Sequence, residues 1–186
     1  NQVRPNWPDQ PITLYGPGAD SGTFDYFTEA VVGKSKSSRG DYTASEDDNV
    51  LVQGVSQDKN ALGYFGFAYY SENRGRLKAV VIDGGKGPVS PSAETVIDGT
   101  YYPLSRPIFI YVNVKSLDRP GVKTFTEYYL RNAAQLVPQV KYIPLSGQDY
   151  AGALNRLNSR KLGTAFGGKP EVGLRVADIL KREPKF

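Results

Sequence analysis

The stretch "ITLYGPGADSGTFDYFTEAVVG" runs from Ile12 to Gly33 and decides the fold of this chain. Its first four residues are apolar, aromatic or β-branched, and they predict a short strand over Ile12–Tyr15. A loop rich in glycine follows, and Ser21 then stands where the N-cap of a helix over 22–32 is expected, with Gly33 as its stop. Strand, loop and helix in this order form the repeating unit of α/β proteins.

The same alternation continues along the rest of the chain. Further strands are predicted at three apolar runs, which are 61–67, 77–82 and 106–114. Helices are predicted at 45–57 with Ser45 as N-cap, near 93–98, at 121–137 after Pro120, and at 150–162. Asn1–Pro11 is expected to be coil, and the polar segment Gly33–Ala44 a loop. The pattern predicts an α/β fold with a largely parallel sheet.

The residue types that are absent exclude several classes of chemistry. The 186 residues include no Cys and no His, so disulfides, thiolate or imidazole metal sites, and Ser-His-Asp triads cannot be built. The net charge of +4 favours anions weakly, but no dense basic block indicates a nucleic-acid surface. The chain also has no Met, and we expect it to be processed, trimmed or engineered, with any signal peptide removed.

The tetrapeptide "DSGT" (Asp20–Thr23) admits four interpretations. It resembles the carboxylate motif of aspartic proteases, although that chemistry needs a second Asp and a β-rich setting. Ser21 could be a nucleophile, but the G-x-S-x-G elbow is not present and no His can serve as base. The helix start could cradle an oxyanion through backbone N–H groups and the two hydroxyls. It could also be a helix cap and nothing more.

Five segments, taken together, resemble the phosphate-binding proteins of bacterial ABC-type phosphate importers. The segments are "GADSGTFDYF", "SEDDNVLVQGV", "ALGYFGFAYY", "RPIFIYVN" and "YIPLSGQDYAGALNRLNSRKLGTAF", in family order and over nearly all of the chain. The resemblance implies a periplasmic-binding-protein-like fold of type II, in which two lobes with mostly parallel sheets close around dehydrated phosphate.

The resemblance also implies which residues bind the ion. The family's Ser-Gly-Thr at a helix start matches Ser21, Gly22 and Thr23, which would donate hydrogen bonds to phosphate. Many members place an arginine four residues before that serine, where this chain has Pro17, so the arginine is expected at Arg39 in "SSRGDY". A guanidinium offers a planar fork of donors for phosphate oxygens. Arg39 could instead be a solvated loop charge.

The family's chain is longer, and the resemblance implies that this one is a C-terminal fragment without the N-terminal anion loop and its Asp. Residues 1–103 are expected to form most of the lobe that carries the Ser-Gly-Thr helix start, and residues 104–186 the C-terminal part of the other lobe. Such a half-site should bind phosphate in the millimolar range or not at all. Unpaired sheet edges should favour pairing with the missing N-terminal segment or self-association.

The resulting expectation is a protein that binds inorganic phosphate and delivers it to the membrane subunits of an ABC-type importer. It would act in the periplasm or at the cell-envelope exterior, with no enzymatic activity, cofactor, metal or nucleic-acid partner. Two alternatives stay open, a phosphatase-like enzyme on the same scaffold and an adhesion or interaction protein. The acidic run Glu46–Asp48 could be paired carboxylates or metal ligands, although helix capping is the simpler interpretation.

Overall fold

The computed structural model describes residues 4–169 and 171–182, and it divides into two compact units. The first unit spans Asn1–Ala79 and the second Val80–Phe186. This division falls earlier in the chain than the predicted lobe boundary at residue 103, and the assignment of the lobes stays a prediction. Of the predicted N-terminal coil, residues 1–3 lie outside the described residues, and residues 4–11 contain no helix or strand.

The first unit is built on a parallel sheet of three strands. These are β1 (Thr13–Pro17), β2 (Thr43–Ser45) and β3 (Ala61–Gly63), in the order β2-β1-β3. Tyr15 of the central strand pairs with Thr43 on one side and Gly63 on the other. The predicted α/β class with a parallel sheet is therefore confirmed here, although β2 lies at the end of a stretch predicted to be loop.

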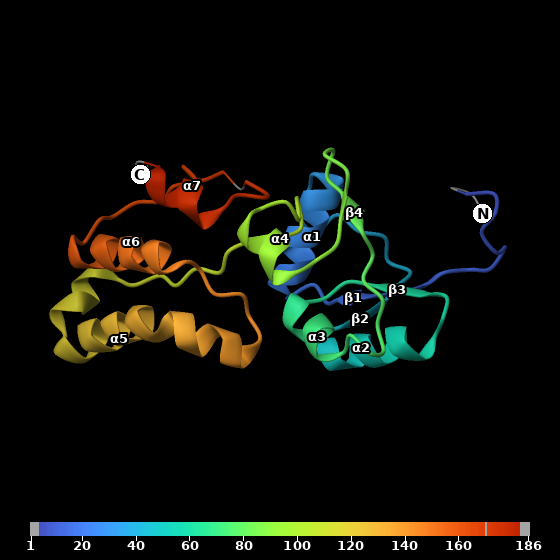
Figure 1. Ribbon diagram of the computed structural model, residues 1–186, viewed down its shortest axis with the longest axis horizontal. Helices are drawn as coiled ribbons and strands as arrows, with labels where there is room; N and C mark the ends of the chain where they lie inside the picture. Colours follow the sequence, from blue (N-terminus) through green and yellow to red (C-terminus); the bar gives the residue numbers. More distant parts are fainter. Residues whose placement is uncertain (1–3, 170, 183–186) are drawn as a thin grey trace. The chain divides into compact units, whose positions relative to one another are not determined.

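Helices cover both faces of this sheet, as Figure 1 shows for α1 (Gly22–Val32) and α2 (Asp48–Gln57). The strand order explains this arrangement. The chain moves from β1 to β2 on one side and then crosses to β3 on the other side of β1. Because connections between parallel strands are almost always right-handed, two connections in opposite directions place their helices on opposite faces. The short α3 (Phe67–Glu72) follows β3 and contacts α2. Phe24 of α1, together with Leu51 and Val52 of α2, is buried and forms the core.

The start of α2 differs from its prediction in detail. The N-cap is Asp47, whose carboxylate accepts a hydrogen bond from the Asn49 N–H at 2.9 Å, and not Ser45. Ser45 ends β2, and its hydroxyl oxygen accepts from the Asp47 N–H at 3.1 Å. The helix therefore begins two residues later than the capping pattern indicated, because Ser45 belongs to the strand.

The second unit is mainly helical. Its helices are α4 (Ala93–Ile97), the 3₁₀ helix η1 (Val114–Asp118), α5 (Pro120–Leu136), the 3₁₀ helix η2 (Val137–Val140), α6 (Gly147–Asn158) and α7 (Val176–Lys181). The helices α5 and α6 pack side by side, and a hairpin of β4 (Ile82–Asp83) and β5 (Pro88–Val89) precedes them. The helix predicted at 150–162 starts earlier, with Ser146 as N-cap, and α7 was not predicted.

Two strands predicted after β3 differ from the structure. Only Ile82 of the run 77–82 is in a strand, and that strand is antiparallel. The run 106–114 contains no strand at all, and Val114 instead starts η1. Ile108, Phe109, Ile110 and Tyr111 are exposed, with Tyr111 at 90%. An apolar run of high strand propensity stays irregular here because no neighbouring strand is present among the described residues.

Candidate functional site

The predicted anion-binding residues lie at the carboxyl edge of the parallel sheet. The loop to α1 follows β1, Glu46 follows β2, and Gly66, the N-cap of α3, lies shortly after β3. In open α/β sheets, ligands bind outside the carboxyl ends of the strands where connections leave in opposite directions. The order β2-β1-β3 places such a point at the end of β1, directly before Ser21.

Ser21 is the N-cap of α1, as predicted. Its backbone is extended, with φ −84° and ψ 127°, and its Oγ accepts a hydrogen bond from the Thr23 N–H at 3.2 Å. The chain turns into the helix through a further bond from the Ser21 N–H to the Gly18 carbonyl at 3.1 Å. At the other end, Gly33 adopts φ 78° and closes the helix with its N–H on the Glu29 carbonyl.

The cap leaves donors available for an anion. The Oγ of Ser21 accepts from Thr23, so the hydroxyl proton of Ser21 can still be donated. Among the residues that the structure describes, none accepts a hydrogen bond from the Gly22 N–H, which belongs to the first turn of α1. The helix dipole adds positive potential at this point. Helix capping and anion binding are therefore compatible interpretations of the same residues.

The contacts that the structure shows for Arg39 are with Asp41 and not with the start of α1. Its Nε and Nη2 donate to the two carboxylate oxygens of Asp41, and both side chains are about two-thirds exposed. The hydrogen bond from Arg39 lowers the pKa of Asp41. The guanidinium fork is thus already engaged by a carboxylate two residues away, and the pairing of Arg39 with an anion stays a prediction.

Two carboxylates of the acidic run contact neighbouring loops. Glu46 Oε1 accepts a hydrogen bond from the Asp20 N–H at 3.3 Å. The same oxygen lies close to Gly18, and a Cβ added at Gly18 would be 1.9 Å from it. Asp48 is half-buried and hydrogen-bonded to the backbone of Gly66, and burial raises its pKa. A side chain at position 18 would therefore displace the Glu46 carboxylate from its place beside this loop, a contact that the sequence did not indicate.

Lys36 is a functional candidate that sequence reasoning missed. Its Nζ donates to the Ala19 carbonyl at 3.4 Å and lies 3.8 Å from Asp25 Oδ1 in the first turn of α1. The sequence carries no signal for this contact, because it depends on how the polar segment after Gly33 folds back along α1. Lys36 is the cation that the structure brings to the loop before Ser21.

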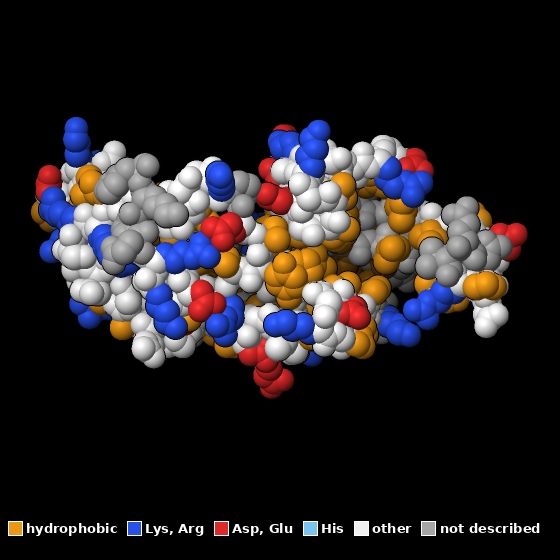
Figure 2. Space-filling model, turned by 90° about the horizontal axis from the view of Figure 1, so that it is seen from above, with side chains coloured by type: hydrophobic (Ala, Val, Ile, Leu, Met, Phe, Trp, Pro, Cys, Tyr) orange, Lys and Arg blue, Asp and Glu red, His pale blue; other side chains and the backbone are white. Residues whose placement is uncertain are grey.

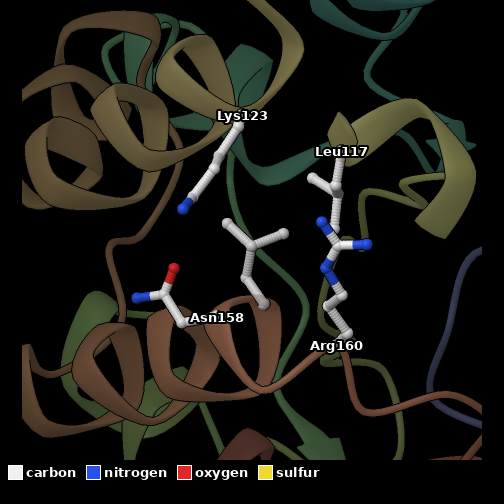
Figure 3. Close-up of a pocket in the computed structure, with 5 residues that line it drawn as sticks. Leu117, Lys123, Asn158 and Arg160 are labelled. Carbon is white, nitrogen blue, oxygen red and sulfur yellow. The ribbon is translucent and has the colours of Figure 1, made fainter. Parts of the chain in front are cut away.

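Two cavities lie away from these residues. The first, of about 30 Å³, lies in the second unit between Leu117, Lys123, Leu157, Asn158 and Arg160 (Figure 3). The second, a polar groove of about 310 Å³ in the first unit, is lined by Asn49, Val52, Gln53, Ser56, Gln57, Asn73 and Arg76. The first has room for water alone. Neither is lined by Ser21, Gly22, Thr23 or Arg39.

The surface and the charged groups offer few other candidates. Lysine and arginine side chains, blue in Figure 2, are scattered over the face shown and do not form one basic patch. Within residues 4–169 and 171–182, no group of three or more carboxylates comes together as a metal site would require. No helix in the described part of the chain has both the length and the apolar character to cross a membrane.

Comparison with known proteins places the chain in a family. The model of the PBP superfamily domain matches residues 1–133. Protein SphX of a Synechocystis species is 52% identical over all of this chain and 56% of its own length, and SphX of Synechococcus elongatus is 49% identical over 98% and 54%. The phosphate-binding protein PstS of Staphylococcus saprophyticus is 35% identical over 84% of this chain and 48% of its own length.

A solved structure agrees with these relatives. The crystal structure of a possible phosphate-binding protein from Planctomyces limnophilus matches with a TM-score of 0.72 and 50% sequence identity, over 85% of this chain and 57% of that one. The chain thus spans about half the length of the curated relatives it matches. The match to the solved structure supports the fold that the sequence pattern predicted.

Proposed function

The chain belongs to the PBP superfamily, and on that premise we propose that it binds inorganic phosphate and serves an ABC-type phosphate importer. The observation that carries the proposal is the start of α1, where Ser21, Gly22 and Thr23 offer hydroxyl and backbone donors at the carboxyl edge of the sheet. Hydrogen bonds to a fully charged acceptor are about twice as strong as neutral ones. A helix start of this kind holds an oxyanion without transforming it.

The names of the relatives support binding over catalysis. The staphylococcal relative is named a phosphate-binding protein, and the solved relative a possible one. A phosphatase would need an activated nucleophile or a metal, and Ser21 Oγ is engaged with the helix backbone and not with a base. The alternatives of a phosphatase-like enzyme and of an adhesion protein are therefore less well supported.

Titration of the isotope-labelled chain with phosphate, followed by NMR, tests the proposal. We expect the amide signals of Ser21, Gly22 and Thr23 to shift with an affinity in the millimolar range, because solvent and salt weaken an exposed anion site. Sodium chloride at the same ionic strength is the control. Equal shifts with phosphate and chloride would overturn the proposal.

Arg39 is proposed as a second cationic group of the site. The ion pair with Asp41 is exposed, and solvent and salt screen such pairs, so Arg39 could exchange Asp41 for phosphate at little cost. If it does so, Arg39→Ala weakens phosphate binding, and Arg39→Lys restores part of the affinity because the ammonium lacks the bidentate fork. Unchanged binding in Arg39→Ala would make Arg39 a solvated loop charge.

For the partners, we propose that the apolar segment Ile108–Tyr111 is covered by a strand from the part of the protein that the relatives have and this chain lacks. Its side chains are between 41% and 90% exposed. No backbone bond joins residues 108–112 to any described residue, and the one ring contact of the segment is Phe109 on Phe166 at 5.7 Å. An apolar segment with free backbone groups fits a β-strand partner.

Sedimentation of the chain tests this partner proposal. In the absence of the covering strand, we expect concentration-dependent self-association, which Ile108→Lys and Tyr111→Lys should reduce by placing charge on the exposed segment. Val80→Lys is the control for added charge, because Val80 is exposed and lies outside the segment. A monomer at all concentrations would contradict the proposal.

The remaining assignments follow from the same premise. We propose that the whole protein acts in the periplasm or at the cell-envelope exterior and contacts the membrane subunits of the importer. Residues 1–103 would contribute most of one lobe and residues 104–186 part of the other. A pull-down of importer subunits by the whole protein, with and without phosphate, would test the partner assignment.

A further inference from the structure

The polar groove of the first unit, about 310 Å³ in volume, lies between one face of α2 and the turn that follows α3. The two helices contact each other and are neighbours in Figure 1. The residues that line the groove are polar except for the buried Val52. Its volume falls at the lower end of the range for binding sites. The groove is therefore large enough to hold a polar ligand.

Three amide side chains follow one another along this face of α2. Asn49, Gln53 and Gln57 are four residues apart, so they repeat at about 6 Å along the helix. Alternate peptide groups of an extended chain repeat at about 6.6 Å, which is nearly the same spacing. An amide side chain both donates and accepts hydrogen bonds, as a peptide group does. The amides of Gln53 and Gln57 are exposed and have no hydrogen bond to the described residues, so both are available.

Arg76 places a cation in the wall of the groove that faces α2. Its Nη2 donates to Ser56 Oγ at 3.3 Å, so the guanidinium reaches from the turn to the helix. The turn itself is ordered, because the N–H groups of Arg76 and Leu77 donate to the Asn73 carbonyl at 2.9 and 3.1 Å. No carboxylate of the described residues forms an ion pair with Arg76. A guanidinium recognises a carboxylate through two parallel hydrogen bonds.

The chain around Arg76 is basic. Residues 72–78 ("ENRGRLK") contain three cationic side chains and one carboxylate. The guanidinium of Arg74 is stacked over the rings of Phe67 at 6.0 Å and Tyr70 at 5.6 Å, which leaves Arg76 as the arginine of the groove. A surface of this sign attracts an acidic ligand and orients it as it approaches.

From these observations we propose that the groove binds an extended acidic peptide segment of a partner protein. A carboxylate of the segment pairs with Arg76, and its peptide groups bond to the amide row of Asn49, Gln53 and Gln57. The row extends over about 12 Å of the helix, further than a single carboxylate reaches, which favours a peptide over a free organic acid. This surface is distinct from the phosphate site proposed above, because none of Ser21–Thr23 lines it.

NMR titration of the isotope-labelled chain in phosphate-free buffer tests the proposal. The probe is a capped alanine pentapeptide with glutamate at its second and fourth positions, and the same peptide with glutamine there is its control. We expect the amide signals of α2 and of the turn 73–76 to shift with a Kd in the millimolar range, because a short peptide on an open groove binds weakly. The glutamine peptide should bind at least about threefold more weakly.

Variants of the chain locate the two kinds of contact. Arg76→Gln should raise the Kd of the glutamate peptide by about twofold to fivefold, as loss of an exposed ion pair would, and Arg76→Lys should recover part of the loss. Gln53→Ala should weaken both peptides alike, because the amide row contacts peptide groups. Lys78→Gln is the matched control for charge, because Lys78 is exposed in the same basic segment and does not line the groove.

Several results would overturn the proposal. Equal effects of Arg76→Gln and Lys78→Gln would reduce the contact to a general effect of charge. Shifts confined to residues outside α2 and the turn 73–76, or no shift at all, would remove the site. Glutarate, a free dicarboxylate, binding as tightly as the glutamate peptide would overturn the peptide assignment. The phosphate titration at Ser21–Thr23 is a separate measurement, so failure here leaves the proposed function standing.

Discussion

Two apolar segments of this molecule have similar sequences and different structures. Residues 12–15 ("ITLY") contribute to β1, which pairs on both sides with parallel strands. Residues 108–112 ("IFIYV") have at least equal strand propensity, yet they are irregular and largely exposed. Strand formation is thus decided by whether backbone partners and a covering layer are present. The first unit supplies them for β1, and the described part of the second unit does not supply them for 108–112.

Hydrogen exchange should show the largest difference between the two segments. The ladder amides of β1 should be protected by about a thousandfold or more, since their opening requires the first unit to unfold. The amides of 108–112 should exchange close to the rate of an unstructured peptide. Mass spectrometry of peptides covering each segment measures both, with α5 as an internal reference for a folded part of the second unit. Equal protection of the two segments would contradict the comparison.

Truncation of apolar side chains should show the next largest difference between the packed first unit and the exposed segment 108–112. Leu51 is fully buried against the sheet, so Leu51→Ala should lower the free energy of unfolding by about 3 kcal/mol. Ile108→Ala should change it by less than about 0.5 kcal/mol, because Ile108 is 65% exposed. Leu62→Ala, at an exposed position of β3, is the matched leucine control. Urea denaturation followed by circular dichroism measures the three changes, and similar losses in all of them would make the comparison untenable.

A substitution between α2 and β1 should lower the stability by a smaller amount. A Cβ at Gly54 would lie 2.2 Å from Tyr15 Cε1, so Gly54→Val should overpack the contact and cost about 2 kcal/mol of stability. Gly40→Val is the control, because a Cβ there meets no atom within 4 Å. Thermal denaturation of the two variants measures the difference. Equal stability would show that the Tyr15 ring moves aside freely.

The smallest effect concerns alkaline pH. Burial, with a lesser contribution from Tyr42, raises the pKa of Tyr64 from 10.0 to about 12. The folded state then keeps a proton that the unfolded state loses, so this contribution to stability is present below pH 10 and is lost as the pH rises to about 12. Partial exposure of the ring keeps the effect small. Tyr64→Phe should flatten this loss and Tyr111→Phe should not, as denaturation at several alkaline pH values would show.

Agreement between prediction and structure is closest where local chemistry is sufficient. The helix over 22–32 has its predicted bounds, because Ser21 caps one end and Gly33 closes the other through contacts within a few residues. Pro120 starts α5 as expected, since its missing N–H costs nothing in a first turn. The predicted N-cap at Ser45 is wrong because Ser45 belongs to β2, where it pairs with Pro17, a residue far away in sequence.

The candidate site likewise combines residues that local sequence predicts with contacts that depend on residues far apart in the chain. The residues Ser21, Gly22 and Thr23 were identifiable from the sequence, because a helix start is encoded locally and their pattern resembles one family. The sequence could not show that Arg39 pairs with Asp41, nor that Glu46 approaches Gly18. Lys36 was not identifiable either, because its position depends on a left-handed residue that is attached to the buried Thr28 hydroxyl.

The sequence by itself determined the α/β class, the position of α1 and the donors at its start, because turn residues, caps and apolar periodicity act over a few residues. Only the tertiary structure decided which apolar runs became strands and which cation lies beside the helix start. These outcomes depend on backbone partners and on side chains that meet across long stretches of chain. Strand pairing and charge placement are non-local, so similar local propensities gave β1 in one unit and an exposed irregular segment in the other.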